Sequence, residues 1–367
     1  MTVVEQGVIS QEGRELAQYI KDLYSSGAKM WTKYMFYDIE AVLVREPRPH
    51  YTLIRSMNGA LRKKQVPLDG ESCDFCEYLY VFPRLKTIQE LVHAAEEQEF
   101  EYDDDEPWPP PTEPDIVDDR ALATRALTFA STDGPSLATY SPALQAAWTE
   151  VQRNWKQSAT CAGLTSIFSK DASISKTTKR VVCFGLGNFG VSPDYTCMES
   201  LAECDDLPVC RAMTQHAAAL TVAETLGKRL GTGPLPIFAQ DPEYSPAAKH
   251  LLASVGIEVV GGRGSLGFTH VDDDTIVFTV CSNICVKQIV ADIAKPLAMI
   301  WDRVSRKVDE RSEFMRQFHE GKWQHVVPWV TDQDSPRTRK LVEDYDDFEL
   351  PADLERFSDI AVYVRRD

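Results

Sequence analysis

Short apolar runs alternate with helical patterns between residues 179 and 304. The runs are almost unbroken and are expected to form buried strands at Arg180–Phe184, Leu235–Gln240, Ile257–Val260, Thr275–Val280 and Leu297–Trp301. Amphipathic stretches between them predict helices over Cys210–Leu230, Ser245–Val255 and Ile284–Ala294. Because apolar strands that alternate with helices are typical of parallel sheets, the pattern predicts an α/β fold. We expect a Rossmann-like, mostly parallel sheet with helices on both faces.

The flanking regions follow a different pattern. Residues 10–45 have apolar residues at helical spacing after Ser10, and residues 141–169 do so after Ser141. An acidic block followed by a proline cluster is typical of a solvated linker or loop. The expected organisation is a mainly helical and variable N-terminal region (1–95), this linker or loop (96–115), a helical segment that packs on the core (116–178), the Rossmann-type core (179–330) and an acidic C-terminal tail (331–367).

Composition and charge narrow the possible functions. Of the 367 residues, 43% are hydrophobic and 10% aromatic, which excludes a chain that is disordered throughout. The net charge of −17 argues against general binding to DNA or to a membrane surface. The chain has no apolar run near the ~20 residues that span a bilayer and no recognisable signal peptide. With an odd number of cysteines, nine, a cytoplasmic location with free thiols is expected.

One stretch departs from the overall acidity. Residues 45–64 include one acidic side chain, Glu46, and six basic ones. The basic residues are Arg45, Arg48, Arg55, Arg62, Lys63 and Lys64. Such a local basic stretch offers contacts to phosphate groups in spite of the net negative charge.

Two motifs resemble cofactor-binding or metal-binding motifs, but their surroundings in the sequence argue against both kinds of site. Residues 185–190 match the dinucleotide fingerprint G-x-G-x-x-G, but Pro193 and a polar loop separate them from the next helix. The glycines are therefore expected to let a loop or a substrate approach the backbone closely. Cys73 and Cys76 form a single C-x-x-C with no second ligand pair, and Cys281 and Cys285 are interpreted as buried thiols. No cofactor and no metal are expected.

Polar residues follow the predicted strands at the edge where parallel sheets bind ligands. Asp241 and Tyr244 follow the second strand, and Ser282 and Asn283 follow the fourth. Gln215 and His216 lie near the start of the first helix. Each has a structural alternative, since Asp241-Pro242 also starts turns, Ser282 also caps helices and His216 also suits a protein interior. Because the topology brings them to one crevice, the set favours a binding site.

In the central block, a strand leads into Gly185-Leu186-Gly187, and a helix with Gln215 follows. Asp241-Pro242 with Tyr244, then Gly256-Ile257, and then the turn Cys281 to Asn283 complete the order over about residues 179–303. This order resembles the SRR-like domain family, named for sensitivity to red light reduced in plants. Relatives often have serine where Asn188 stands, and this chain lacks the proline-histidine pair of plant and animal members. The Cys-Ser-Asn ending and the N-terminal extension resemble the filamentous-fungal branch.

The resemblance implies two alternative functions. Plant and animal members are regulatory proteins linked to circadian output and haem metabolism, which act through protein contacts. Some fungal members resemble the arginine-containing cyclodipeptide synthases, aminoacyltransferase-type enzymes of secondary metabolism that join two amino acids from aminoacyl-tRNAs into a cyclic dipeptide. We expect the enzyme, with arginyl-tRNA and a second aminoacyl-tRNA as partners and neither DNA nor a membrane. A dinucleotide oxidoreductase is a more distant alternative.

The expected chemistry assigns roles to the crevice residues. A carboxylate pairs well with a guanidinium group, so Asp241 or Glu243 is expected to bind the arginyl side chain. Acyl acceptance or proton transfer is expected of the catalytic candidates Ser282, Tyr244 and His216. The other residues expected to line the substrate site are Gln215, Asn283, Gly187 and Asn188. The residues expected to contact tRNA phosphates are Arg55, Arg62, Lys63 and Lys64.

Overall fold

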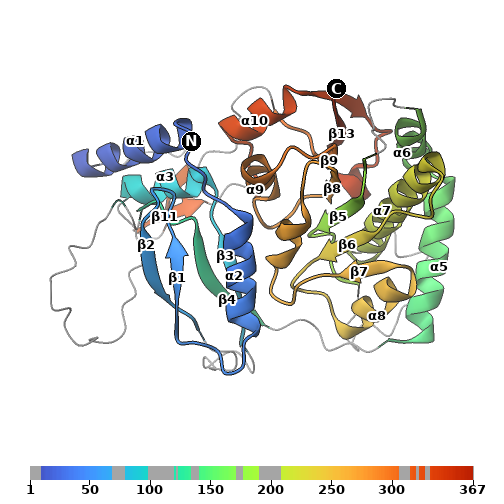
Figure 1. Ribbon diagram of the computed structural model, residues 1–367, viewed down its shortest axis with the longest axis horizontal. Coiled ribbons are helices and arrows are strands. Elements are labelled where there is room, and N and C mark those ends of the chain that lie inside the picture. Colours follow the sequence, from blue (N-terminus) through green and yellow to red (C-terminus); the bar gives the residue numbers. More distant parts are fainter. Residues whose placement is uncertain are drawn as a thin grey trace.

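The computed structural model describes residues 10–67, 79–97, 120, 123–133, 140–170, 177–189, 208–305, 315–319, 322–326 and 331–366 (Figure 1). Its centre is a seven-stranded sheet with the strand order β12-β13-β9-β8-β5-β6-β7. The strands are β5 (Arg180–Phe184), β6 (Ile237–Gln240), β7 (Ile257–Val259), β8 (Thr275–Thr279), β9 (Ala298–Asp302), β12 (Tyr345–Glu349) and β13 (Ile360–Arg365). Strands β5 to β9 are parallel, whereas β12 and β13 are antiparallel to their neighbours. The prediction of an α/β fold with a mostly parallel sheet is confirmed.

Both faces of this sheet are buried. Alternate side chains of β5 point to opposite sides, so that Val181 and Cys183 belong to one apolar cluster and Val182 and Phe184 to the other. The first face is covered by α5 (Pro142–Gln157), α6 (Ala159–Lys170), α7 (Pro208–Leu230) and α8 (Pro246–Ser254). The second face is covered by the 3₁₀ helix η3 (Leu266–His270), α9 (Val286–Ile293), α10 (Pro336–Val342) and the N-terminal region.

The C-terminal residues do not form a separate tail. Strand β13 is buried almost throughout and pairs with β9, and β12 then forms the edge of the sheet. A short helix, α11 (Leu354–Phe357), connects the two strands. The acidic residues that suggested a tail, such as Asp346 and Asp347, lie on exposed positions of the edge strand β12. Acidity here marks the solvent-facing side of a structured element.

The N-terminal region contains strands as well as the predicted helices. The stretch 10–45 forms two helices, α1 (Gln11–Ser25) and α2 (Lys33–Val44), because the chain turns after α1 at Gly27 with φ +95°. The pair β1 (Tyr51–Arg55) and β2 (Leu61–Gln65) forms one hairpin. Strand β3 (Leu79–Leu85) pairs with β4 (Leu127–Asp133), so the predicted helical segment 116–178 includes a strand. Helix α3 (Ile88–Glu97) packs on α1. A further hairpin consists of β10 (Met315–His319) and β11 (Lys322–Val326).

The N-terminal region is held against loops at the carboxyl ends of the central strands. The buried carboxylate of Glu40 on α2 accepts hydrogen bonds from the backbone N–H groups of Gly262 (2.5 Å) and Arg263 (3.0 Å), which follow β7. After β8, the Gln288 side chain accepts a hydrogen bond from the Ile88 N–H at 2.9 Å. Charge-assisted and amide contacts of this kind fix the N-terminal region on the core.

Some sequence features lie outside the described residues. They are the Cys73–Cys76 motif, residues 98–115 of the expected linker, and Gly190 of the glycine motif. Among the helices that the structure does describe, none is both long and apolar enough to cross a membrane.

Candidate functional site at the carboxyl edge of the sheet

The loop after β5 joins two groups of polar residues at the carboxyl edge. Gly185 and Gly187 have φ values of +59° and +85°, which favour glycine. A Cβ atom on Gly185 would lie 3.1 Å from the Ser282 Oγ, so the loop passes directly beside the turn after β8. In the other direction, the Gly187 N–H donates to the Asp241 Oδ2 at 3.0 Å. Asp241 and Ser282 therefore lie on the same edge of the sheet, on either side of this loop.

Asp241 presents an oriented, half-buried carboxylate. Its Oδ1 accepts a hydrogen bond from the Glu243 N–H at 2.9 Å, so each oxygen accepts one backbone hydrogen bond. Burial raises the pKa of Asp241 to about 6, and the nearby charge of Glu243 acts in the same direction. A carboxylate oxygen can accept more than one hydrogen bond, so the arrangement leaves acceptor capacity for a bidentate donor.

Asn188 supports the same loop. Its Oδ1 accepts a hydrogen bond at 3.2 Å from the N–H of Ser245, the residue that caps helix α8. The Asn188 side chain thus connects the glycine loop to the start of α8. Glu243 lies exposed beside Asp241.

Three predicted site residues point into the protein. Tyr244 and His216 are fully buried, and the Tyr244 hydroxyl lies 2.7 Å from the His216 Nε2. The His216 Nδ1 lies 2.7 Å from the Ala212 carbonyl oxygen, an acceptor, so Nδ1 carries the proton and Tyr244 donates to Nε2. Burial lowers the pKa of His216 to about 4. The buried Gln215 donates to the Arg356 carbonyl oxygen at 2.7 Å. His216 thus connects α7 to the loop before α8, and Gln215 connects α7 to α11.

The turn after β8 exposes a cysteine and buries the serine. Ser282 is only 1% exposed, and its Oγ accepts a hydrogen bond from the Ile284 N–H at 3.2 Å. Cys281 is exposed and has a φ of +47°, which is uncommon for a residue with a Cβ. The interpretation of both thiols as buried is thus correct for Cys285 and wrong for Cys281. The tight turn forces successive side chains to opposite sides. Asn283 is exposed.

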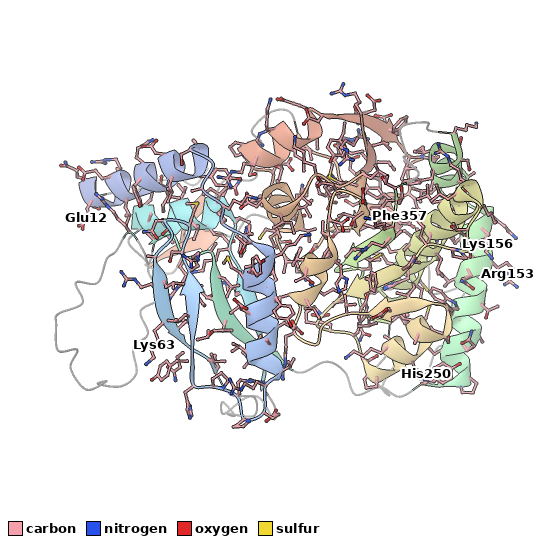
Figure 2. All side chains as sticks on the ribbon, in the orientation of Figure 1. Glu12, Lys63, Arg153, Lys156, His250 and Phe357 are labelled. Carbon is pink, nitrogen blue, oxygen red and sulfur yellow. The ribbon has the colours of Figure 1, made fainter. Side chains whose placement is uncertain are left out.

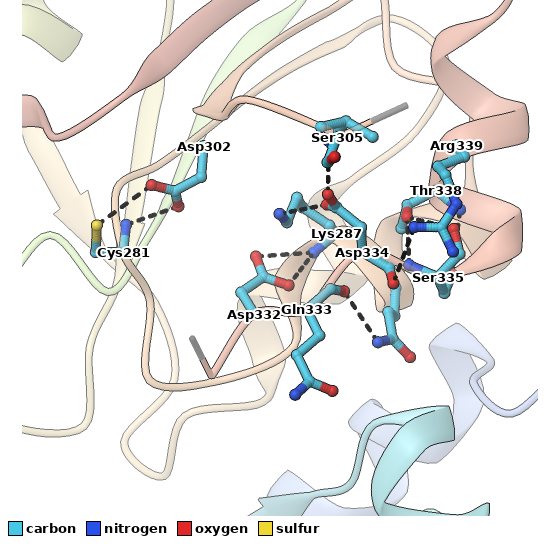
Figure 3. Close-up of polar contacts among 12 residues, drawn as sticks. Cys281, Lys287, Asp302, Ser305, Asp332, Gln333, Asp334, Ser335, Thr338 and Arg339 are labelled. Atoms are coloured by element: carbon cyan, nitrogen blue, oxygen red, sulfur yellow. Dashed lines mark hydrogen bonds and ion pairs between the residues drawn. The ribbon is translucent and has the colours of Figure 1, made fainter. Parts of the chain in front are cut away.

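Cys281 contacts an aspartate at the end of β9 (Figure 3). The Asp302 carboxylate accepts one hydrogen bond from the Cys281 N–H at 2.9 Å and one from its Sγ at 3.2 Å. Burial raises the pKa of the Cys281 thiol to about 11, and the Asp302 charge contributes. A thiol with a carboxylate acceptor is a pair that can transfer a proton.

A buried ion cluster lies next to this pair at the start of α9 (Figure 3). Lys287 is 2% exposed, and its Nζ lies 2.7 Å from the Asp334 Oδ1. The backbone N–H of Lys287 donates to both Asp332 oxygens at 3.1 and 3.2 Å. Burial raises the pKa of Asp332 to about 8, while Lys287 opposes the shift and Asp302 and Asp334 add to it. The Lys287 ammonium thus pairs directly with Asp334, while Asp332 and Asp302 contribute negative charge nearby.

Stability should therefore depend on Asp332 between about pH 4 and pH 8. In this window the folded protein holds a proton that the unfolded chain has lost, so the free energy of unfolding falls as pH rises and levels off above about 8. Asp332→Asn removes this titration and keeps an oxygen for the Lys287 N–H. We expect its thermal melting temperature, relative to wild type, to rise by a few degrees between pH 6 and pH 9. Asp347→Asn, an exposed carboxylate on β12, is the control. A difference that is flat with pH would contradict the assignment.

The predicted phosphate contacts lie on the β1–β2 hairpin. In its register, Leu53 pairs with Lys63 and Arg55 with Leu61. Arg55 and Lys63 therefore share the exposed face, whereas Arg62 and Lys64 lie on the opposite, half-buried face. Helix α2 lies between this hairpin and the central sheet (Figure 1). The structure brings two of the four residues together.

Sequence reasoning gave no site role to four residues of the carboxyl edge, which are Lys287, Asp302, Asp332 and Asp334. Asp302 is the last residue of β9, and Asp241 directly follows β6, so a carboxylate at the carboxyl end of a strand is a usable signal. Lys287, Asp332 and Asp334 give no such signal, because Lys287 is 45 and 47 positions from the two aspartates in the sequence. In the part of the chain that the structure describes, no cluster of three His, Cys, Asp or Glu side chains has a metal-binding arrangement.

The comparison with protein families agrees with this architecture. The family model of the SRR1 domain matches residues 158–364, from α6 to β13. No curated protein and no solved structure matches the chain. The matched region includes the whole central sheet, the glycine loop and both groups of carboxyl-edge residues. Since it covers more than half of the chain, the chain belongs to the SRR1 domain family.

Proposed function

We propose that this SRR1-domain protein is an aminoacyl-tRNA-dependent cyclodipeptide synthase that joins arginine to a second amino acid. One observation carries the proposal: an oriented carboxylate, Asp241, accepts a hydrogen bond from the glycine loop, and an exposed thiol, Cys281, directly precedes Ser282, which lies beside the same loop. The first suits a guanidinium group and the second suits an acyl group. An SRR1 regulator that acts only through protein contacts needs neither.

Arginine is the favoured side chain because the carboxyl edge is negatively charged. Asp241, Glu243 and Asp302 lie there, against the exposed Arg211 near Cys281, and the buried ammonium of Lys287 is already paired with Asp334. The planar guanidinium matches two carboxylate oxygens, and Asp241 keeps acceptor capacity on both. Glu243, which is exposed, adds a second negative charge for the same group.

Acyl transfer through Cys281 balances without a cofactor. The thiol sulfur attacks the ester carbonyl of the arginyl-tRNA and its proton passes to Asp302. The ester C–O bond then breaks, and Asp302 returns the proton to the departing tRNA oxygen, so that Asp302 is a carboxylate again. The amine of the second aminoacyl-tRNA then attacks the thioester, which forms the peptide bond and releases the thiol. Finally, the arginine amine attacks the remaining ester, which closes the ring and frees the second tRNA.

The raised pKa of Cys281 is compatible with this role. Without substrate, partial desolvation of the sulfur and the Asp302 charge keep the thiol protonated, and a protonated thiol is less readily oxidised than a thiolate. A bound cationic arginyl group adds positive charge nearby and lowers the pKa of the thiol. In this proposal Cys281 takes the acyl role expected of Ser282. The buried pair of Tyr244 and His216 serves to hold the loop framework.

The test is product formation from defined components. The purified protein is incubated with tRNA, arginine, the other amino acids, ATP and synthetases, and mass spectrometry follows arginine-containing cyclic dipeptides. The product should disappear when ribonuclease is added. The absence of product, together with no binding of aminoacyl-tRNA, would favour the regulatory alternative.

Asp241→Asn should lower the rate of formation of the arginine product by about 10- to 100-fold, the range for loss of a charge-assisted pair. The amide is nearly isosteric but no longer attracts the guanidinium. The matched control is Asp347→Asn on the edge strand β12, which should leave the rate unchanged. Thermal melting of each variant separates a binding effect from unfolding. Equal rates for Asp241→Asn and wild type would remove Asp241 from the arginine site.

A further inference from the structure

Helix α2 has apolar residues on its outer side as well as on its inner side. Phe36, Ile39 and Leu43 are buried against the core. On the opposite side, Tyr34 is 82% exposed and Tyr37 62% exposed, and Val44, about two turns after Tyr37, is 55% exposed. A surface helix of a globular protein is normally polar on its outer side, so this stripe has the composition of a contact surface.

The neighbouring hairpin exposes a similar mixture on one face. The apolar residues of this face are Tyr51, Leu53 and Leu61, and its basic residues are Arg55 and Lys63. The Lys63 Nζ lies 3.9 Å from the centre of the Tyr51 ring, so charge and aromatic surface are directly adjacent. Large apolar side chains on an exposed two-stranded hairpin gain little stability, which again favours a contact role.

A groove of about 440 Å³ connects the two elements. Tyr34 and Asp38 line it from α2, and Leu53, Arg55 and Leu61 line it from the hairpin. We call the exposed residues Tyr34, Tyr37, Tyr51, Leu53, Arg55, Leu61 and Lys63 the hairpin–α2 face. Figure 2 shows Lys63 at the opposite end of the molecule from Arg153 and Lys156 on α5.

The charge of this face identifies the chemistry of its partner. Two basic residues, Arg55 and Lys63, lie on this face of the hairpin, in a chain whose net charge is −17. Asp38 is the acidic residue that lines the groove. A partner must therefore supply negative charge together with flat apolar groups. Unpaired nucleotides supply both, because their bases stack on aromatic rings while their phosphates meet basic side chains, whereas a duplex hides its base faces.

We propose that the hairpin–α2 face binds unpaired nucleotides of an RNA. The identification of the RNA as a tRNA rests on the proposed function, but the binding of single-stranded RNA does not. The tyrosines stack on bases, Arg55 and Lys63 contact phosphates, and Leu53 and Leu61 fill the floor of the groove.

The test is fluorescence anisotropy with a labelled RNA of about 12 nucleotides, a length within the site sizes of single-strand binders. The same sequence in a duplex is the comparison. The full-length protein should bind the single strand at least about tenfold more tightly than the duplex. Tyr34→Ala with Tyr37→Ala should weaken binding about tenfold or more, and Arg55→Glu with Lys63→Glu should weaken it and flatten its salt dependence.

Matched controls exist on the far side of the molecule. Arg153→Glu with Lys156→Glu changes the net charge equally on α5, and Tyr140→Ala removes an exposed tyrosine that packs on His250. These variants should bind RNA like the wild type. Equal weakening by the controls, or equal binding of the duplex, would overturn the proposal. A ten-residue polyglutamate peptide that binds as tightly and depends on the same residues would show a protein partner instead.

The two proposals can fail separately. Formation of cyclic dipeptides by a protein whose face variants bind RNA normally would reject the RNA-binding face and leave the proposed function intact. RNA binding that depends on the face, without any product from aminoacyl-tRNA, would reject the synthase and leave the binding face.

Discussion

Replacing Arg337 by alanine is expected to destabilise the protein by about 3–5 kcal/mol, the usual cost of removing one partner of a buried ion pair. The Arg337 guanidinium donates to the Asp292 Oδ1 at 2.5 Å and to the Ala28 carbonyl oxygen at 2.6 Å. It also lies 3.7 Å from the centre of the Tyr24 ring. Asp292 is 5% exposed, and burial already raises its pKa against the opposing effect of Arg337. Without Arg337, a carboxylate stays buried without its counter-charge.

The loss should be visible in urea unfolding at pH 7. Lys340→Ala on the same helix is the control, because Lys340 pairs with Glu343 at an exposed site and such pairs contribute about 1 kcal/mol or less. Arg337→Ala combined with Asp292→Asn should recover part of the loss, since the amide keeps a hydrogen bond without a charge. If Arg337→Ala and Lys340→Ala were equally stable, the buried pair would have no structural role.

Cys281→Ala is expected to abolish formation of the cyclic dipeptide, with a fall in rate of at least about a thousandfold, because the acyl acceptor is lost. Cys281→Ser keeps an acceptor atom of similar geometry and should retain measurable activity. Folding should be little affected, since Cys281 is exposed. Rates are measured by mass spectrometry of the product, with thermal melting as the control for folding.

The acyl intermediate gives an independent readout. With arginyl-tRNA alone, the protein mass should increase by one arginyl group, and hydroxylamine should remove it, as it cleaves thioesters. Asp302→Asn should slow this acylation but leave the thiol available to iodoacetamide. If the Cys281→Ala variant still formed the cyclic dipeptide, a covalent step at this residue would be excluded.

The five parallel strands of the central sheet could be predicted from sequence to within two residues at either end, whereas β12 and β13 lie in the stretch that was predicted as a tail. Runs such as Arg180–Phe184 are apolar because both faces of the sheet are covered, and this pattern is local. The N-terminal hairpin could not be predicted, since Tyr51 and Leu53 are apolar but exposed. Their exposure contradicts the rule by which strands are recognised, namely an apolar side that faces the core.

The location of a candidate site residue could be predicted from sequence where the residue directly follows a strand. Asp241 follows β6 directly, and the edge at which it lies follows from the parallel topology. The direction of a side chain was not predictable: Gln215 and His216 lie on α7 at the expected place but point into the protein. The sequence also did not show that Cys281 is exposed and Ser282 buried, because this depends on the positive φ of Cys281 in the turn.

Strand β13 has a consequence for how the protein is made. It pairs with β9, yet it lies well beyond β9 in the chain, after α10 and β12. While the chain is being synthesised, β9 has a partner on one side only, β8, and its other edge exposes unpaired N–H and C=O groups. The sheet becomes complete only when Ile360–Arg365 has been made, so a chain cut before this strand has an open, apolar edge that can pair with another molecule.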